Sequence, residues 1–233
     1  KGDQSIINSI YDIELVDNLP LPKVKIEHRF TKKEYIETVE KLQNHIKRGD
    51  IYEVNFCQEF FAANAEINPQ AIFQKLNQVS PTPFAGFFKI YDKYILSATP
   101  ERFLCKRGNK LISQPIKGTA KRSLNVDEDE LIKVKLKSSI KEQAENVMIV
   151  DLVRNDLSRT ATKGSVEVEE LCHVYTFKQV HQMISTVVSN VEDSTSPIEI
   201  LKTTFPMGSM TGAPKISAMK IIEDLEETKR GLY

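Results

Sequence analysis

The sequence predicts an α+β domain with antiparallel or mixed sheets and helices on their outer faces. Strand-like runs follow one another between residues 85 and 113 with short turns, which is typical of a meander. Segments with helical periodicity separate this group from later strand-like runs, and strands grouped in this way favour an α+β arrangement. The 233 residues are enough for one sizeable domain with a real core.

The sequence marks both the start and the end of its first helix. Residues 1–30 are consistent with a linker or an edge strand, or with the remnant of an amino-terminal portion. Thr31 with Glu34 three residues later forms a capping box, and apolar residues then recur at helical spacing. Gly49 ends the pattern, so we predict a helix between Thr31 and Gly49.

The following segments alternate between strand and helix signals. Residues 51–61 are dense in β-branched and aromatic residues and predict a mostly buried strand. Asn68 and Pro69 are typical of the N-cap and first position of a helix, which runs to Val79. We expect further strands at 85–90, 94–97, 102–106, 110–113, 166–174 and 180–191, helical structure over 127–156, and helices starting near Pro197 and Pro214.

Composition excludes several classes of function. Lys plus Arg and Asp plus Glu both number 32, so the chain has no basic footprint for nucleic acid. The three cysteines are far apart and odd in number, which fits neither a disulfide framework nor a CxxC motif and favours a reducing, cytoplasmic setting. No stretch approaches the ~20 apolar residues of a membrane span, and the first residues lack the apolar core of a secretory signal peptide. We therefore expect a soluble protein with a small-molecule site.

The most informative stretch is Gln114 to Arg122, which reads QPIKGTAKR. A short strand precedes it, Pro115 ends the ladder, and Gly118 lets the backbone approach a ligand closely. Lys117 therefore lies between a strand and a Gly-Thr turn. It is either a solvated turn lysine or the reactive amine of a site.

Five segments in order resemble the chorismate-utilising enzymes, a family that includes anthranilate, aminodeoxychorismate, isochorismate and salicylate synthases. They are GDIYEVN (49–55), SATPERF (97–103), the stretch around Lys117, EQAENVMIVDLVRNDLSR (142–159) and PMGSMTGAPK (206–215). The resemblance covers Thr31 to the last residue. It implies two large sheets packed together, flanked by helices, with the active site between them. A lysine before Gly-Thr is similar to the branch that forms 4-amino-4-deoxychorismate.

The resemblance implies a nucleophile and an acid. Lys117 would add to ring carbon two of chorismate as the hydroxyl leaves carbon four, and ammonia would then enter and expel the lysine. Glu101 matches the general acid, since partial burial raises a carboxyl pKa. Deprotonating a free lysine at pH 7 costs about 4.6 kcal/mol. The alternative is therefore that Lys117 remains an ammonium that clamps a carboxylate or the departing oxygen.

The same resemblance implies a magnesium site and a group of residues that line the substrate-binding site. Glu142 and Glu145 share one helix face, and in the family this pair belongs to a Mg²⁺ site that holds a substrate carboxylate, with Glu145 matching the ligand proper. Magnesium favours a few carboxylates with waters and substrate oxygens. Free N–H groups near the helix that starts at Pro214 favour anions. Residues expected to bind substrate are Gly118, Thr119, Thr211, Gly212, Gln182 and Glu53.

Two positions depart from the family. Glu53 lies where the amine-adding relatives usually carry glutamine. Its carboxylate would take a proton from Lys117 or from incoming ammonium, or form a salt bridge to a nearby cation. Gln182 replaces an active-site histidine of anthranilate and salicylate synthases, so that role is not transferred. The neighbouring His181 is expected to point to the other sheet face.

The segment after Arg230 leads, in the family, into further strands with more ligands, and we interpret residues 31–233 as a chorismate-binding domain without its carboxy-terminal part. The predicted function is an amine transfer to chorismate for p-aminobenzoate and folate synthesis, with ammonia from a glutamine amidotransferase partner. Anthranilate formation is the alternative within the family. A non-catalytic module that binds chorismate or a partner is the alternative outside it.

Overall fold

The computed structural model describes residues 4–5 and 23–231, which divide into two compact units. The smaller unit contains Ala62–Pro100 with residues 4–5 and 23–26. The larger contains Glu27–Phe61 and the chain from Glu101 onwards. The α+β class is confirmed, and every strand pairing among the described residues is antiparallel. Most of the predicted segment 1–30 lies outside the described residues.

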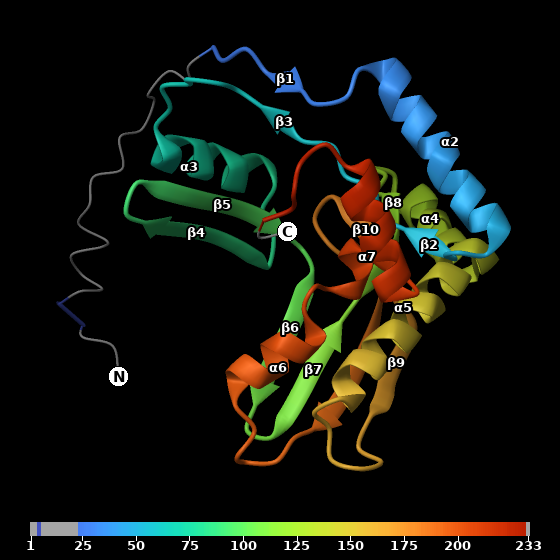
Figure 1. The fold of residues 1–233 in the computed structure, drawn as a ribbon. Coiled ribbons are helices and arrows are strands. Elements are labelled where there is room, and N and C mark those ends of the chain that lie inside the picture. Colours follow the sequence, from blue (N-terminus) through green and yellow to red (C-terminus); the bar gives the residue numbers. More distant parts are fainter. Residues whose placement is uncertain (1–3, 6–22, 232–233) are drawn as a thin grey trace. The chain divides into compact units, whose positions relative to one another are not determined.

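The smaller unit is a helix on a hairpin (Figure 1). Asn68 caps helix α3 (Pro69–Val79) through the amides of Gln70 and Ala71, as predicted from the Asn-Pro signal. Strands β4 (Phe84–Ile90) and β5 (Lys93–Thr99) pair along their full length. Phe73 of the helix packs on Phe87 of the hairpin with ring centroids 5.6 Å apart. Aromatic contact therefore joins the helix to the hairpin.

A five-stranded sheet forms the centre of the larger unit (Figure 1). Strand β10 (Val180–Asn190) pairs on one edge with β9 (Glu167–Thr176). Its other edge pairs first with β8 (Ile116–Lys121) and then with β7 (Lys110–Gln114), which pairs in turn with β6 (Arg102–Arg107). Two large sheets were expected. The described residues form this one, and their other sheets have two strands each.

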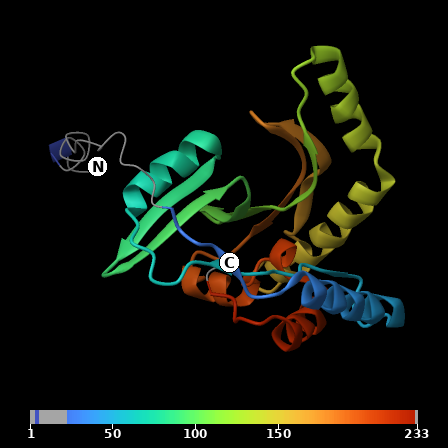
Figure 2. The same cartoon turned by 90° about the horizontal axis from the view of Figure 1, so that it is seen from above.

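Two consecutive helices cover one face of this sheet, as Figure 2 shows for the yellow-green segment. Helix α4 (Val126–Ser138) and helix α5 (Ile140–Ser158) divide at Ser139, within the stretch predicted to be helical. Apolar side chains of α5 and the sheet form the main core; they are Leu111, Ile149, Val150, Val153, Leu157, Val187 and Val191, with Ile200 of α6 (Pro197–Thr204). Burial of this stripe fixes the face of α5 that meets the sheet.

The predicted capped helix is present as α2 (Lys32–Arg48). Thr31 and Glu34 make both bonds of the capping box, and Gly49 ends the helix at φ +82°. By contrast, the single strand predicted for 51–61 is wrong. This segment forms only β2 (Glu53–Val54) and β3 (Phe60–Phe61), because its partners are short: β11 (Gly212–Ala213) for β2 and β1 (Glu27–His28) for β3.

The carboxy-terminal part places the glycine loop beside β2. After α6, the chain forms a short 3₁₀ turn η1 (Gly208–Met210), then β11, then helix α7 (Lys215–Leu225). Within the part of the chain that the structure describes, no helix is both long and apolar enough to cross a lipid bilayer.

Candidate active site

Lys117 lies in a strand and not at the edge of a turn, which corrects the prediction from sequence. Pro115 does end β7, but β8 resumes at Ile116 on the same edge of β10. Ile116 pairs with Ile184 and Thr119 with Gln182, so the two residues Lys117 and Gly118 oppose the single residue Met183. Such a bulge bends the strand and changes the direction of its side chains.

A buried asparagine fixes this bulge. Asn146 of α5 is completely buried, and its side-chain amide donates to the carbonyls of Lys117 (3.3 Å) and Met183 (3.2 Å). The Ser185 hydroxyl donates to the Asn146 side-chain oxygen at 2.5 Å. Sequence reasoning missed Asn146. Its signal was a polar residue in line with the buried Ile149, Val150 and Val153 on one helix face.

Lys117 forms an ion pair with Glu53, two residues that lie far apart in the sequence. The Nζ atom is 2.6 Å from Oε1 of Glu53, and the two side chains are 21% and 16% exposed. The salt bridge considered for Glu53 is therefore present, and its cation is the predicted nucleophile. The other oxygen of Glu53, Oε2, is buried and has no hydrogen-bond partner among the described residues.

The backbone holds Glu53 in place through the glycine loop. The Tyr52 amide donates to the Ala213 carbonyl at 2.7 Å, and the Asn55 amide donates to the Thr211 carbonyl at 2.8 Å. Gly212 has φ +149°, and a Cβ there would lie 2.2 Å from the Glu53 carbonyl oxygen. Only glycine permits this approach of β11 to β2.

The loop itself is fastened by a buried ion pair. The Lys215 ammonium donates to Asp156 of α5 at 2.5 Å, and also to the carbonyls of Thr204 and Pro206. Both charged side chains are at most 12% exposed. Asp156, in the RND stretch of α5, therefore has a structural role. The Thr211 hydroxyl is buried against the carbonyls of Met207 and Gly208, so it is engaged within the loop.

Glu101 is held against Ile116, the residue that precedes Lys117. Its Oε1 accepts a hydrogen bond of 3.0 Å from the Ile116 amide. Burial raises the pKa of Glu101, and the Ile116 amide, the nearby Ser209 hydroxyl and the Lys117 charge oppose this rise less strongly. A raised pKa keeps the proton on a carboxyl group at higher pH. The influence of Ser209 on Glu101 was not anticipated, because only the fold brings η1 near Glu101.

Glu142 and Glu145 lie on α5 behind the bulge. A Cβ on Gly118, which has φ +96°, would lie 3.2 Å from Oε2 of Glu142, so this carboxylate reaches the Lys117 segment. The Lys141 ammonium is 3.5 Å from Glu142 and 3.2 Å from Glu145. The two carboxylates therefore converge on one cation. Carboxylates are ligands that Mg²⁺ prefers, although no group of three acidic, His or Cys side chains suited to a metal occurs in the described part.

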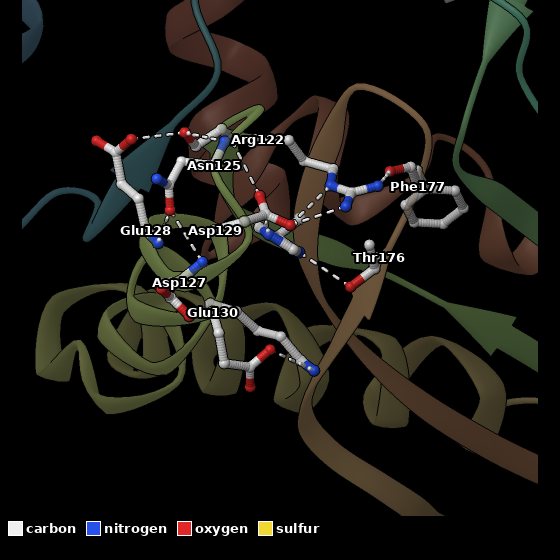
Figure 3. Close-up of polar contacts among 11 residues, drawn as sticks. Arg122, Asn125, Asp127, Glu128, Asp129, Glu130, Thr176 and Phe177 are labelled. Carbon is white, nitrogen blue, oxygen red and sulfur yellow. Dashed lines mark hydrogen bonds and ion pairs between the residues drawn. The ribbon is translucent and has the colours of Figure 1, made fainter.

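Gln182 is buried on β10 opposite Thr119, and its side-chain oxygen has no hydrogen-bond partner among the described residues. Its neighbour His181 points to the other face, as predicted, and contacts Asp129 of α4 at 3.0 Å. Arg122, which directly follows β8, donates to Asp129 at 2.8 and 3.1 Å (Figure 3). These contacts lower the pKa of Asp129 to about 2, with the Arg122 hydrogen bond as the main cause.

The strand that carries Lys117 is thus fixed at both ends. A groove of about 810 Å³ lies elsewhere, between α5, β9 and the start of α7, and none of the predicted catalytic or metal residues lines it. The predicted residues instead gather around β8. Glu53, Glu101 and Glu142 approach Lys117 or Gly118, whereas Glu145 is linked through Lys141 and Glu142.

Residues 15–233 match the family described as chorismate binding enzyme. The chain belongs to this family. The match starts at residue 15, whereas the sequence motifs placed the start of the resemblance at Thr31. Aminodeoxychorismate synthase component 1 of Escherichia coli is 40% identical over 89% of this chain and 46% of the relative, and that of Bacillus subtilis is 37% identical over 88% and 43%. Anthranilate synthase component 1 of Thermus thermophilus is 35% identical over 91% and 46%.

A solved structure supports the same fold. The crystal structure of anthranilate synthase component I from Streptococcus pneumoniae matches with a TM-score of 0.84 and 28% identity, over 99% of this chain and 51% of that one. The chain therefore spans about half the length of the relatives it matches.

Proposed function

We propose that this chain is part of an aminodeoxychorismate synthase, which replaces the ring hydroxyl of chorismate with the nitrogen of ammonia. The product is 4-amino-4-deoxychorismate, a precursor of p-aminobenzoate and folate. The observation that carries the proposal is the position of Lys117 on a bulge, within 2.6 Å of Glu53 and beside the buried acid Glu101. Relatives at about 40% identity that carry the name of this synthase support it.

The proposed chemistry begins with the pair of Lys117 and Glu101. The lysine amine attacks ring carbon two, both ring double bonds shift along the ring toward carbon four, and the bond from carbon four to oxygen breaks. Glu101 gives its proton to the leaving oxygen, which departs as water. Ammonia then attacks carbon four, both ring double bonds shift back, and the lysine leaves as an amine. The raised pKa of Glu101 favours the protonated form that this step requires.

Other residues would bind and orient the substrate. Glu142 and Glu145 would hold Mg²⁺, which when bound supplies positive charge to a substrate carboxylate. The Gly118 and Gly212 backbones, with Thr119 and the unsatisfied Gln182, would line the ring site, and Thr211 would keep the loop in shape. Ammonia would come from a glutamine amidotransferase subunit, in keeping with the words "component 1" in the names of relatives. We also propose a cytoplasmic location for the protein, as expected from its three cysteines.

The test is to incubate the complete protein with chorismate, Mg²⁺ and ammonium. We expect a p-aminobenzoate signal only after a lyase is added. Lys117→Ala should reduce this signal by at least a hundredfold, since it removes the nucleophile, while Lys121→Ala on the same strand, with its exposed side chain, should not. Undiminished turnover by Lys117→Ala would refute the proposal. Anthranilate fluorescence that appears without a lyase would indicate an anthranilate synthase instead. Chorismate binding without turnover would indicate a non-catalytic module.

A further inference from the structure

Glu53 has a geometry that an ordinary structural ion pair does not require. Its Oε1 is 2.6 Å from the Lys117 Nζ, while Oε2 is buried and has no hydrogen-bond partner among the described residues. A buried carboxylate that serves stability normally satisfies both oxygens. Asp129 does so in this chain: one oxygen accepts from Arg122, and the other from the Ser123 amide beside the His181 ring. Glu53 therefore has one carboxylate oxygen, Oε2, that does not accept a hydrogen bond from any described residue.

The position of Glu53 is also fixed independently of Lys117. Hydrogen bonds from the flanking Tyr52 and Asn55 amides to the glycine loop hold its backbone, and Arg230 donates to the Asn55 carbonyl at 2.5 Å. Loss of the proton from Lys117 would therefore leave the backbone that carries the Glu53 carboxylate in place. A group that stays within hydrogen-bond distance of an amine before and after proton transfer meets the geometric requirement for a base.

We propose, on the basis of the function proposed above, that Glu53 is the base that takes the proton from Lys117 and stores it while the lysine is bound to the ring. The resting pair is an ammonium and a carboxylate. Proton transfer gives a neutral amine and a neutral carboxyl group, so that no net charge is created. Among free lysines at pH 7, only about one in 2500 is neutral, which is why a base in contact matters.

The proton balance of the cycle closes with Glu53 in this role. The amine forms its bond to carbon two and becomes a secondary ammonium, while the Glu101 proton leaves with the hydroxyl as water. Ammonia forms the bond to carbon four, and the electrons of the bond to carbon two return to the lysine nitrogen, which leaves as a neutral amine. The new ammonium on carbon four gives one proton to Glu101. Glu53 then returns its stored proton to Lys117.

The test measures the formation of the covalent adduct on Lys117 in the complete protein. Chorismate and Mg²⁺ are mixed with the protein without ammonia, and the mass of the Lys117 peptide is followed with time between pH 6.5 and 9.5. The parent should form the adduct with little dependence on pH near neutrality. Glu53→Gln should be slower by about 10² to 10³ at pH 7. Its rate should rise about tenfold for each pH unit, because hydroxide must then deprotonate the lysine.

Two further variants separate catalysis from structure. Glu59→Gln removes a carboxylate that pairs with Arg29 at 2.6 Å outside the site, so its rate and pH profile should equal those of the parent. Glu53→Asp keeps a base and should retain the pH profile of the parent at a lower rate. Thermal unfolding and chorismate binding show whether each variant is folded.

Each outcome decides the inference. A Glu53→Gln variant that forms the adduct at the rate of the parent would overturn it, and so would a variant slower by the same factor at every pH, which indicates only a positional role. If the parent itself forms no adduct on Lys117, the covalent route of the proposed function fails, and the role of Glu53 fails with it. An adduct on the parent combined with an unchanged variant refutes Glu53 alone.

Discussion

Replacing Gly212 with alanine should separate the loop from the strand that carries Glu53. The new Cβ would lie 2.2 Å from the Glu53 carbonyl oxygen and 2.9 Å from the Val54 Cα. Both are backbone atoms, so no side-chain rotation relieves the overlap. The positive φ of +149° adds strain for any residue with a Cβ, of about 1 to 3 kcal/mol.

The magnitude follows from what the separation breaks. Moving β11 away from β2 loses the hydrogen bonds from the Tyr52 and Asn55 amides, each worth about 0.5 to 1.5 kcal/mol. Strain and lost bonds together lower the free energy of unfolding by about 2 to 6 kcal/mol. Because domains of ordinary stability have about 5 to 15 kcal/mol, the effect is a large part of the total.

The assay is urea unfolding followed by circular dichroism, with Gly108→Ala as the matched control. Gly108 also has a positive φ, of +58°, but a Cβ there meets no atom within 4 Å. It should therefore cost only the strain, about 1 to 2 kcal/mol. If Gly212→Ala destabilised the protein no more than Gly108→Ala, the close approach of the two strands would not be a constraint, and the argument for the loop would be wrong.

Two further predictions concern ion pairs. The pKa of Asp129 is lowered to about 2 in the fold, against about 3.9 in an unfolded chain. Its stabilising contribution is therefore complete above about pH 5 and is lost as the pH falls toward 2. Asp129→Asn should flatten this part of a profile of stability against pH measured by urea unfolding, and an unchanged profile would refute the role of Asp129. Breaking the buried pair with Asp156→Ala or Lys215→Met should each cost about 3 to 5 kcal/mol in thermal or urea unfolding, with a double variant well below their sum. Asp151→Asn, whose pair with Arg154 is exposed, is the control and should change stability by less than about 0.5 kcal/mol.

Local signals account for the parts of the fold that the sequence predicted well. The bounds of α2 follow from a capping box and a left-handed glycine, and the start of α3 follows from Asn-Pro. These signals act within a few residues, so no tertiary contact is needed to interpret them. Residues 51–61 lacked such signals. Their β-rich composition predicted one strand, but strand length depends on partners that come from other parts of the chain.

The candidate site likewise contains residues that local motifs predicted and features that depend on the tertiary fold. The residue types at Lys117, Glu101 and Glu53 were visible as motifs, and the resemblance indicated their roles. The bulge was not predictable, because it depends on the register between β8 and β10. Asn146, Ser209 and the Arg122 network were missed for a related reason: each acts on an atom that only folding brings near.

The position of Lys141 leads to a prediction about magnesium. Its ammonium faces one oxygen of Glu142 and one of Glu145, so it competes for the carboxylates that would hold the metal. The Lys141 side chain is 75% exposed, so solvent screening makes each of the two pairs weak. Removing both pairs with Lys141→Met should therefore tighten Mg²⁺ binding by about twofold to thirtyfold. Isothermal titration of the complete protein measures this change.

The control for this experiment is Lys33→Met, which removes a lysine that is also largely exposed (86%) and is paired with Glu37 on α2. It alters the net charge by the same amount, but it lies away from the two carboxylates, so the Mg²⁺ affinity should stay at the value of the parent. Tighter binding in both variants would indicate a general effect of charge. Unchanged affinity in Lys141→Met would mean that Glu142 and Glu145 are not the metal ligands, because a cation between two ligands has to be displaced before they bind another.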